Sequence, residues 1–268
     1  MTGMFLGLWT RLAKRSLLLW TYGAVLAAAA LITTVVVVSA SEGNSATAGL
    51  PGPPGTSLTP GEIVAFDGQL LGLANAVVLL GIVAVVVAAG QMAGEYATGT
   101  LRNLLVREPR RWRLLLGWWL GVSSFLAGAV LLASVVAGLA AQLVATGRGF
   151  DTSQWYTADG LASSAQTVGL TLGAIVGYGT IGTALGVVLR APIPAIGIGV
   201  GWLLALELAL AQFVDGLDKY LPGQLLGAVA AGGTESLTLG QSTQTIVTYL
   251  VGAAALTTFL FTRRDVTA

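Results

Sequence analysis

Long apolar stretches alternate with shorter polar segments along the chain. Each apolar stretch is long enough to cross about 30 Å of hydrocarbon as a helix, which rises about 1.5 Å per residue. We therefore predict an all-α membrane protein made of a single transmembrane domain. Its six transmembrane helices are expected over residues 17–40, 63–91, 114–145, 165–189, 194–214 and 242–262.

The polar segments between these spans differ in character. Residues 41–62 are rich in Gly, Ser and Pro, which is typical of an exposed loop. Residues 146–164 form a second predicted outer loop, edged by the interfacial aromatics Trp155 and Tyr156. Residues 215–241 are too short and too rich in glycine to cross. We expect them to form short helices that dip into the outer leaflet or lie on it.

The placement of charge predicts the orientation. All but two of the 13 Lys and Arg residues fall on one side of the predicted spans, and the two exceptions are Arg148 and Lys219. Most of the acids lie on the other side. Because basic loops stay in the cytoplasm, we expect a plasma-membrane protein with both termini cytoplasmic.

Two interpretations of the N-terminal region remain open. Residues 1–16 are either a basic amphipathic lead-in that lies on an anionic membrane surface or an ordinary flank of the first span. The small residues Val38-Ser39-Ala40 are compatible with signal-peptide cleavage. We favour a retained anchor, because the apolar core before them exceeds the usual length of a signal peptide.

Composition narrows the possible functions. The chain is 55% hydrophobic and 9% charged, carries a net charge of +1, and contains no Cys and no His. These values argue against nucleic acid as a partner, against disulfides, and against the usual zinc sites and imidazole bases. No nucleotide-binding P-loop motif occurs, and the lysines are Lys14 and Lys219. We predict that the chain is not an enzyme and binds no metal or cofactor itself.

The polar segment 94–113 lies between the second and third spans. Ala97, Leu101, Leu104 and Leu105 follow helical spacing and form one apolar face. Glu95, Thr98 and Arg102 form another face, so we predict an amphipathic helix of about three turns that ends before Pro109. Arg110, Arg111 and Arg113 then flank the third span, where lipid headgroups or partner carboxylates can accept their hydrogen bonds.

This segment resembles the cytoplasmic loop of type-2 ABC transporter permeases. The resemblance rests on Glu95-Tyr96, Gly99-Thr100-Leu101-Arg102, Leu105, Pro109 and Arg113, followed by an apolar span. The six-span layout and the Tyr220-Leu-Pro-Gly segment before the last span are also similar. Members of that family often have a lysine near the position of Trp118, and this chain departs from them there.

The resemblance implies a coupling helix that docks on a separate ATP-hydrolysing subunit. It assigns this ATPase-coupling role to Glu95, Tyr96, Gly99, Thr100, Arg102, Pro109 and Arg113. It also implies two copies of an ABC ATPase, which would hold ATP and Mg, and a second permease copy or a sibling. The expected function is export of a hydrophobic or amphipathic substrate. A basic inner loop without a docking role remains the alternative, especially for the arginines that follow Pro109.

Glu207 is a second candidate site, because it lies well inside the predicted fifth span. An intramembrane carboxylate is a functional-site hypothesis by default. It could line a translocation path, bind a cationic substrate or relay protons, or it could be a protonated glutamate that hydrogen-bonds a neighbouring helix. The alternative functions are therefore a proton-coupled secondary carrier built around Glu207 and a membrane scaffold that recruits a cytoplasmic protein.

Glycines recur at helical spacing in the fourth and fifth spans. Gly169, Gly173 and Gly177 are four residues apart, Gly182 and Gly186 follow, and Gly197 and Gly201 repeat the spacing. Such surfaces let membrane helices approach closely. We interpret these glycines as packing surfaces.

Overall fold

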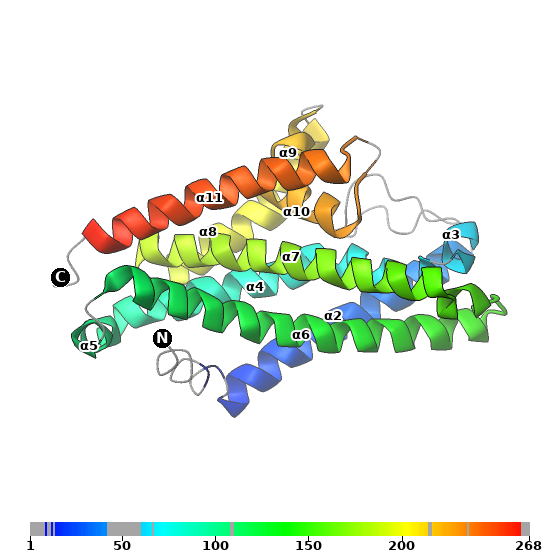
Figure 1. Cartoon of the computed structure of the whole chain (residues 1–268), viewed down its shortest axis with the longest axis horizontal. Coiled ribbons are helices and arrows are strands. Elements are labelled where there is room, and N and C mark those ends of the chain that lie inside the picture. The colour runs from blue at the N-terminus through cyan, green and yellow to red at the C-terminus, as the bar shows by residue number, and fades with distance from the viewer. Residues whose placement is uncertain are drawn as a thin grey trace.

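The computed structural model of the chain is all-α in the part that it describes, which comprises residues 9, 12, 14–41, 60–65, 67–107, 110–213, 216–234 and 236–263. Five long apolar helices run side by side along its long axis (Figure 1). Each is long and apolar enough to cross a membrane, as expected of an integral multi-pass membrane protein. They are α2 (Arg15–Ser41), α4 (Leu71–Ala97), α6 (Arg111–Gly147), α7 (Ala158–Leu189) and α11 (Leu239–Arg263).

Short helical elements connect and cover these five helices. The second predicted span begins later than expected, because a break near Asp67 separates α3 from η1. The short elements are α3 (Pro60–Val64), η1 (Gly68–Leu70), α5 (Thr100–Arg107), η2 (Ser153–Tyr156), α8 (Pro192–Gly201), the π-helical segment η3 (Trp202–Leu206), α9 (Glu207–Phe213), η4 (Leu217–Lys219) and α10 (Pro222–Ala230).

Helix α4 is the centre of the bundle and packs against α2, α7 and α8. Its apolar window is 72% buried, whereas that of α11 is 17% buried. Close contact with α7 requires glycine: a Cβ on Gly182 would lie 2.8 Å from the Val85 carbonyl oxygen, and one on Gly186 would lie 2.8 Å from Met92 Cβ. These two glycines of the predicted packing surface therefore pack against the second span.

The predicted fifth span is a helix in three parts. Pro192 opens α8, the π-helical segment follows, and α9 continues to Phe213. A π segment inserts an extra residue into a turn and redirects the side chains that follow it. Here it brings Trp202 and Glu207 onto the same side of the helix, where they hydrogen-bond.

Helix α10 is buried on all sides, from Gly223 to Ala230. Short helices were expected within residues 215–241, and α10 is one of them. Its burial places it inside the bundle. Pro222 occupies its first turn, where a missing backbone N–H costs no hydrogen bond.

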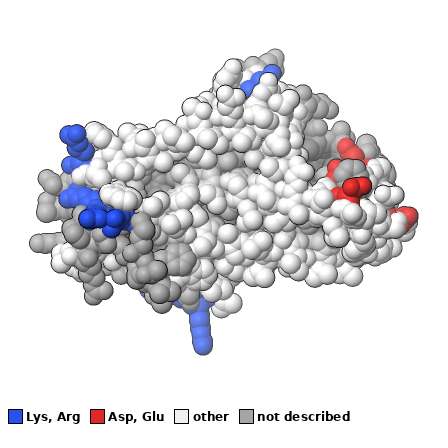
Figure 2. All heavy atoms as spheres, viewed as in Figure 1, with Lys and Arg blue, Asp and Glu red and all other residues white. Residues whose placement is uncertain are grey.

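Charge is separated along the bundle. Figure 2 shows basic atoms gathered where α5 lies and acidic atoms at the opposite end, where α3 lies. We call these the basic end (Arg110, Arg111, Arg113, Arg190 and Arg263) and the acidic end (Glu62, Asp67, Asp151 and Asp159). At the acidic end the Ser153 backbone N–H donates to Asp151 and holds the pKa of that carboxyl below its usual value.

One predicted interfacial aromatic at the acidic end is instead part of the core. Trp155 is fully buried, and its indole N–H donates to the Ile63 carbonyl oxygen at 2.9 Å. Tyr156 is 58% exposed, as an interfacial residue should be. Trp155 is buried because α3 folds over the loop, a contact between segments about ninety residues apart.

Candidate functional site

The turn between α4 and α5 contains most of the predicted coupling residues. Helix α4 ends at Ala97, Thr98 caps it, and Gly99 has a positive φ of 68°. Helix α5 then begins at Thr100 and has eight residues. The prediction of one helix of about three turns was therefore wrong, because left-handed backbone at Gly99 ends the first helix and reorients the second. Ala97 is exposed and does not share a face with Leu101.

Glu95 lies inside this turn. Its side chain is buried, and the Thr100 hydroxyl donates a hydrogen bond to its carboxylate. The Thr98 hydroxyl lies 3.0 Å from that of Thr100 and donates to the Gly94 carbonyl oxygen at 2.8 Å. Glu95 and Thr100 thus fix the direction in which α5 leaves α4.

Helix α5 has one face on the bundle and one face exposed. Leu101 is buried, and Leu104 and Leu105 pack against the main hydrophobic core. On the opposite face Asn103 is exposed and Val106 is 80% exposed. The amphipathic pattern is therefore present in α5 itself, with a shorter apolar face than predicted. The side chain of Arg102 and the whole of Pro109 lie outside the described residues.

Tyr96 connects this turn to two other helix ends. The Arg190 guanidinium carbon lies 5.4 Å from the centre of the Tyr96 ring, a distance typical of a cation–π contact. The Phe261 ring of α11 meets the Tyr96 ring edge-on, with centroids 6.4 Å apart. Arg190 caps α7 with a positive φ of 55°. The ends of α4, α7 and α11 therefore meet at one tyrosine.

The arginines that begin α6 have different surroundings. Arg111 donates from Nη1 to the carbonyl oxygens of Phe261 and Thr262, at 3.5 and 3.2 Å. Those carbonyls end α11, where a cation is favoured by the helix dipole. Arg113 lies over the Trp112 ring, with its guanidinium carbon 5.3 Å from the ring centre. Arg111 is thus a link between helices, whereas Arg110 is exposed.

Glu207 caps a buried helix. The backbone N–H groups of Gly223 and Gln224 donate to its two carboxylate oxygens at 3.0 and 3.1 Å, and the Trp202 indole N–H donates at 2.6 Å. Gly223 and Gln224 belong to the first turn of α10, whose N–H groups have no partner within the helix. A carboxylate there is stabilised by the helix dipole. Glu207 is thus 1% exposed but well supplied with donors.

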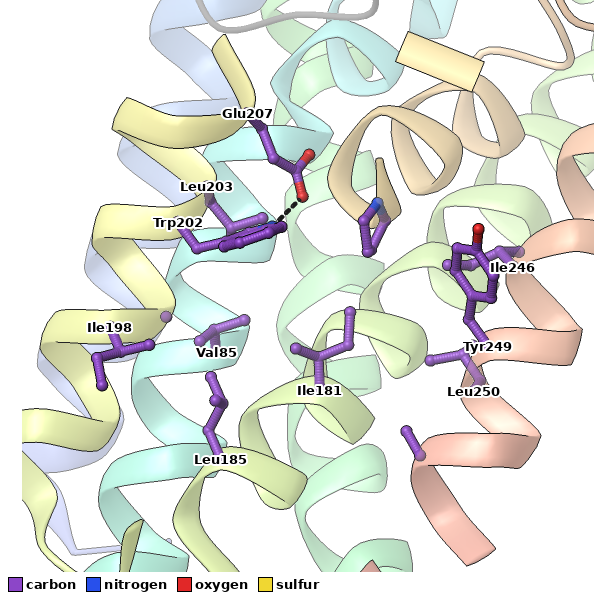
Figure 3. A pocket seen from close by; sticks show the side chains of 13 residues that line it. Val85, Ile181, Leu185, Ile198, Trp202, Leu203, Glu207, Ile246, Tyr249 and Leu250 are labelled. Carbon is purple, nitrogen blue, oxygen red and sulfur yellow. Dashed lines mark hydrogen bonds between the residues drawn. The ribbon is translucent and has the colours of Figure 1, made fainter. Parts of the chain in front are cut away.

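Glu207 and Trp202 also line a cavity of about 350 Å³. Figure 3 shows these two residues on one wall and Ile246, Tyr249 and Leu250 of α11 on the opposite wall, with Val85 of α4 between them. The remaining lining is almost entirely aliphatic. The cavity can therefore hold an apolar group, with Glu207 near one end.

Two residues of this site, Gly223 and Tyr178, could not be identified from the sequence. Gly223 permits the close approach of Glu207, because a Cβ there would lie 2.4 Å from Oε2. Tyr178 is fully buried and donates from its hydroxyl to the Gly223 carbonyl oxygen at 3.0 Å. The Pro222-Gly223 pair is a signal for a helix start. Nothing in the sequence relates that start to Glu207 or Tyr178.

The family model described as "Protein of unknown function (DUF2705)" matches residues 57–267. The match includes the α4–α5 turn and the whole of the Glu207 site. No curated protein matches the chain.

Proposed function

We propose, from the premise that the chain belongs to the DUF2705 family, that it is the membrane subunit of an ATP-driven exporter whose ATPase is a separate chain. The observation that carries this proposal is the placement of α5. Its apolar face is fixed to the bundle through Leu101, while its opposite face, with Val106, is exposed at the basic end. That arrangement provides a docking surface on a rigid support.

The contacts behind α5 support a coupling role for it. Glu95 and Thr100 fix its angle to α4. Tyr96 then connects the end of α4 to Arg190 of the α7–α8 hairpin and to Phe261 of α11. A displacement of α5 by a bound ATPase would reach three helices through these contacts. A solvated basic loop needs none of them.

The charge distribution supports an orientation with the basic end in the cytoplasm of a plasma-membrane protein. In this orientation both termini are cytoplasmic, and α8, η3 and α9 serve as the fifth of six spans. The docking surface on α5 then faces the compartment that holds ATP. The ATPase, expected in two copies, would bind ATP and Mg, and this chain would bind neither.

The cavity beside Glu207 supports an apolar or amphipathic substrate. Its lining is aliphatic and aromatic apart from the carboxylate and the Tyr249 hydroxyl. One face of the cavity is formed by α11, which is largely exposed in the single chain. We therefore place the transport path next to α11, where a second copy or a sibling permease would complete it.

Cross-linking tests the docking proposal sharply, because the chain contains no cysteine. A Val106→Cys variant that carries a benzophenone maleimide, co-expressed with a candidate ABC ATPase, should form a photo-cross-link to that ATPase. Tyr156→Cys is the matched control, because Tyr156 is also well exposed but lies at the acidic end. Equal cross-linking at both positions, or at neither, would refute docking on α5.

Coupling is tested by substitutions at the turn. Thr100→Val removes the hydroxyl that donates to Glu95, so ATPase stimulation by the permease should fall severalfold. Thr245→Val is the control, because the exposed Thr245 hydroxyl donates only to the Gln241 carbonyl oxygen of its own helix, α11. Glu95→Arg and Gly99→Trp should abolish the complex. If the unmodified chain forms a stable complex with the ATPase but transports nothing measurable, the chain is instead a scaffold.

A proton-coupled carrier is the second candidate, favoured by the position of Glu207 at the wall of an intramembrane cavity. The three N–H groups that donate to Glu207 argue against that role, because they hold the carboxylate in place as part of the fold. Transport that persists without ATP and stops with a protonophore would establish the carrier and exclude the exporter.

A further inference from the structure

A second apolar cleft lies on the outside of the bundle, between α6, α7 and α11. Its volume is about 410 Å³, and we call it the α6–α11 cleft. Trp112 and Trp119 of α6, Gly173 of α7, and Val251 and Thr258 of α11 are among its lining residues. Trp112 is 49% exposed and Val251 is 63% exposed, so the cleft is open along its side. In a membrane such a side faces lipid.

The threonine hydroxyls and the Trp119 indole N–H of this cleft already have hydrogen-bond partners within the protein. The Trp119 indole N–H donates to the Thr180 hydroxyl at 2.9 Å. The hydroxyls of Thr257 and Thr258 donate to carbonyl oxygens one turn earlier in α11, at 2.6 and 2.7 Å. An alkyl chain in the cleft would therefore leave none of these hydroxyls without a partner. A polar ligand would find few groups to bind.

The length of the cleft matches one leaflet of a bilayer. On α11 it extends from Val247 to Thr258, which is about 16 Å at the usual helical rise. On α7 it extends from Gly173 to Thr183, which is about 15 Å by the same measure. Half of a typical hydrocarbon core is also about 15 Å. The cleft thus accommodates one acyl chain lengthwise.

Two arginines lie at one end of the cleft. Trp112 lines that end, and the Arg113 guanidinium lies over its ring. Arg111 of the same helix lies between the ends of α6 and α11, because its Nη1 donates to the carbonyl oxygens of Phe261 and Thr262, just beyond Thr258. Both arginines can therefore face a lipid phosphate at this end of the cleft.

We propose that the α6–α11 cleft binds one anionic phospholipid of the bilayer, with an acyl chain along α11 and the headgroup beside Arg111 and Arg113. Both arginines are near a membrane surface, where each basic side chain favours an anionic lipid about fivefold. The cleft should therefore bind an anionic lipid more tightly than a neutral lipid with the same acyl chains. The difference should come from charge alone. This lipid site does not depend on whether an ATPase docks on α5.

Quenching of tryptophan fluorescence by brominated lipid tests this site directly. The full chain is placed in nanodiscs that contain either dibrominated phosphatidylglycerol or dibrominated phosphatidylcholine at equal mole fraction. Phosphatidylglycerol should quench more strongly at low mole fraction, and added salt should reduce the difference because it screens the charges. The excess quenching should disappear in a Trp112→Phe, Trp119→Phe variant, which removes the two reporters of the cleft.

Four variants, one of them a control, separate the contributions of charge and of space in the cleft. Arg111→Gln and Arg113→Gln should each lower the lipid preference about fivefold. Arg15→Gln is the matched control, because it removes the same charge from α2, away from the cleft. Gly173→Leu should weaken quenching by both lipids, since a Cβ at Gly173 meets no atom within 4 Å and the added side chain fills the cleft.

The thermal midpoint of each variant is measured alongside, so that a folding defect is recognised. If the arginine variants are destabilised, Gly173→Leu alone tests the site. Equal quenching by the two lipids, or an equal loss of preference with Arg15→Gln, would overturn the proposal.

Discussion

The carboxylate of Glu207 accepts a hydrogen bond from the backbone N–H of Gly223 at 3.0 Å, and a side chain at Gly223 would occupy the same space. An acid in the middle of an apolar helix is thereby joined to the start of a buried helix sixteen residues later. The same carboxylate forms part of the wall of a cavity. Its structural and functional roles therefore depend on one set of contacts.

Gly223→Ala should destabilise the protein by about 1–3 kcal/mol, as overpacking of a filled site does. The added Cβ would lie 2.4 Å from Glu207 Oε2 and 2.9 Å from Leu203 Cδ2. Gly169→Ala is the control, because a Cβ there meets no atom within 4 Å. Thermal unfolding in detergent, followed by size-exclusion chromatography, measures both. A midpoint for Gly223→Ala that equals the control would show that α10 is not held closely against Glu207.

Glu207→Gln should destabilise the protein by about 1–3 kcal/mol, the usual cost of an unsatisfied buried polar group. The new amide keeps one acceptor oxygen but turns an N–H₂ group toward a ring of N–H donors. Trp202→Phe removes one donor and leaves both α10 contacts, so it should cost less. If transport by Glu207→Gln is normal at every pH, then Glu207 neither relays protons nor binds a substrate through its charge.

Gly99→Ala should destabilise the α4–α5 turn by about 1–2 kcal/mol, because a φ of 68° strains any residue that carries a Cβ. Gly99→Asn should retain more stability, since asparagine tolerates left-handed backbone. Gly94→Ala is the control one turn earlier, where a Cβ also meets no atom within 4 Å. Thermal midpoints rank the three variants. If Gly99→Ala and Gly94→Ala behave alike, backbone strain does not set the direction of α5.

Single cysteines determine the orientation of the bundle. In intact cells, a membrane-impermeant maleimide should label Tyr156→Cys and should label Val106→Cys only after the membrane is opened. Both side chains are exposed, and they lie at the acidic and basic ends respectively. The opposite labelling pattern would place α5 outside the cell and remove the basis of ATPase docking.

The long helices could be predicted from the sequence, because burial in lipid requires long apolar runs and these are visible in one dimension. The predicted spans over 17–40, 114–145, 165–189 and 242–262 correspond to α2, α6, α7 and α11. Local breaks were harder to place. A glycine with positive φ at position 99 and a π-helical segment at 202–206 depend on the contacts around them.

The sequence by itself determined that this protein has long apolar stretches, a basic segment between two of them, and a carboxylate within another. Only the tertiary structure decided that Glu207 caps α10, that Glu95 is buried beneath α5, and that Tyr96 meets Arg190. The physical reason is that hydrophobic burial fixes the length of a membrane helix but not its rotation. Rotation depends on hydrogen bonds and close packing between residues far apart in the chain, such as Tyr178 and Gly223.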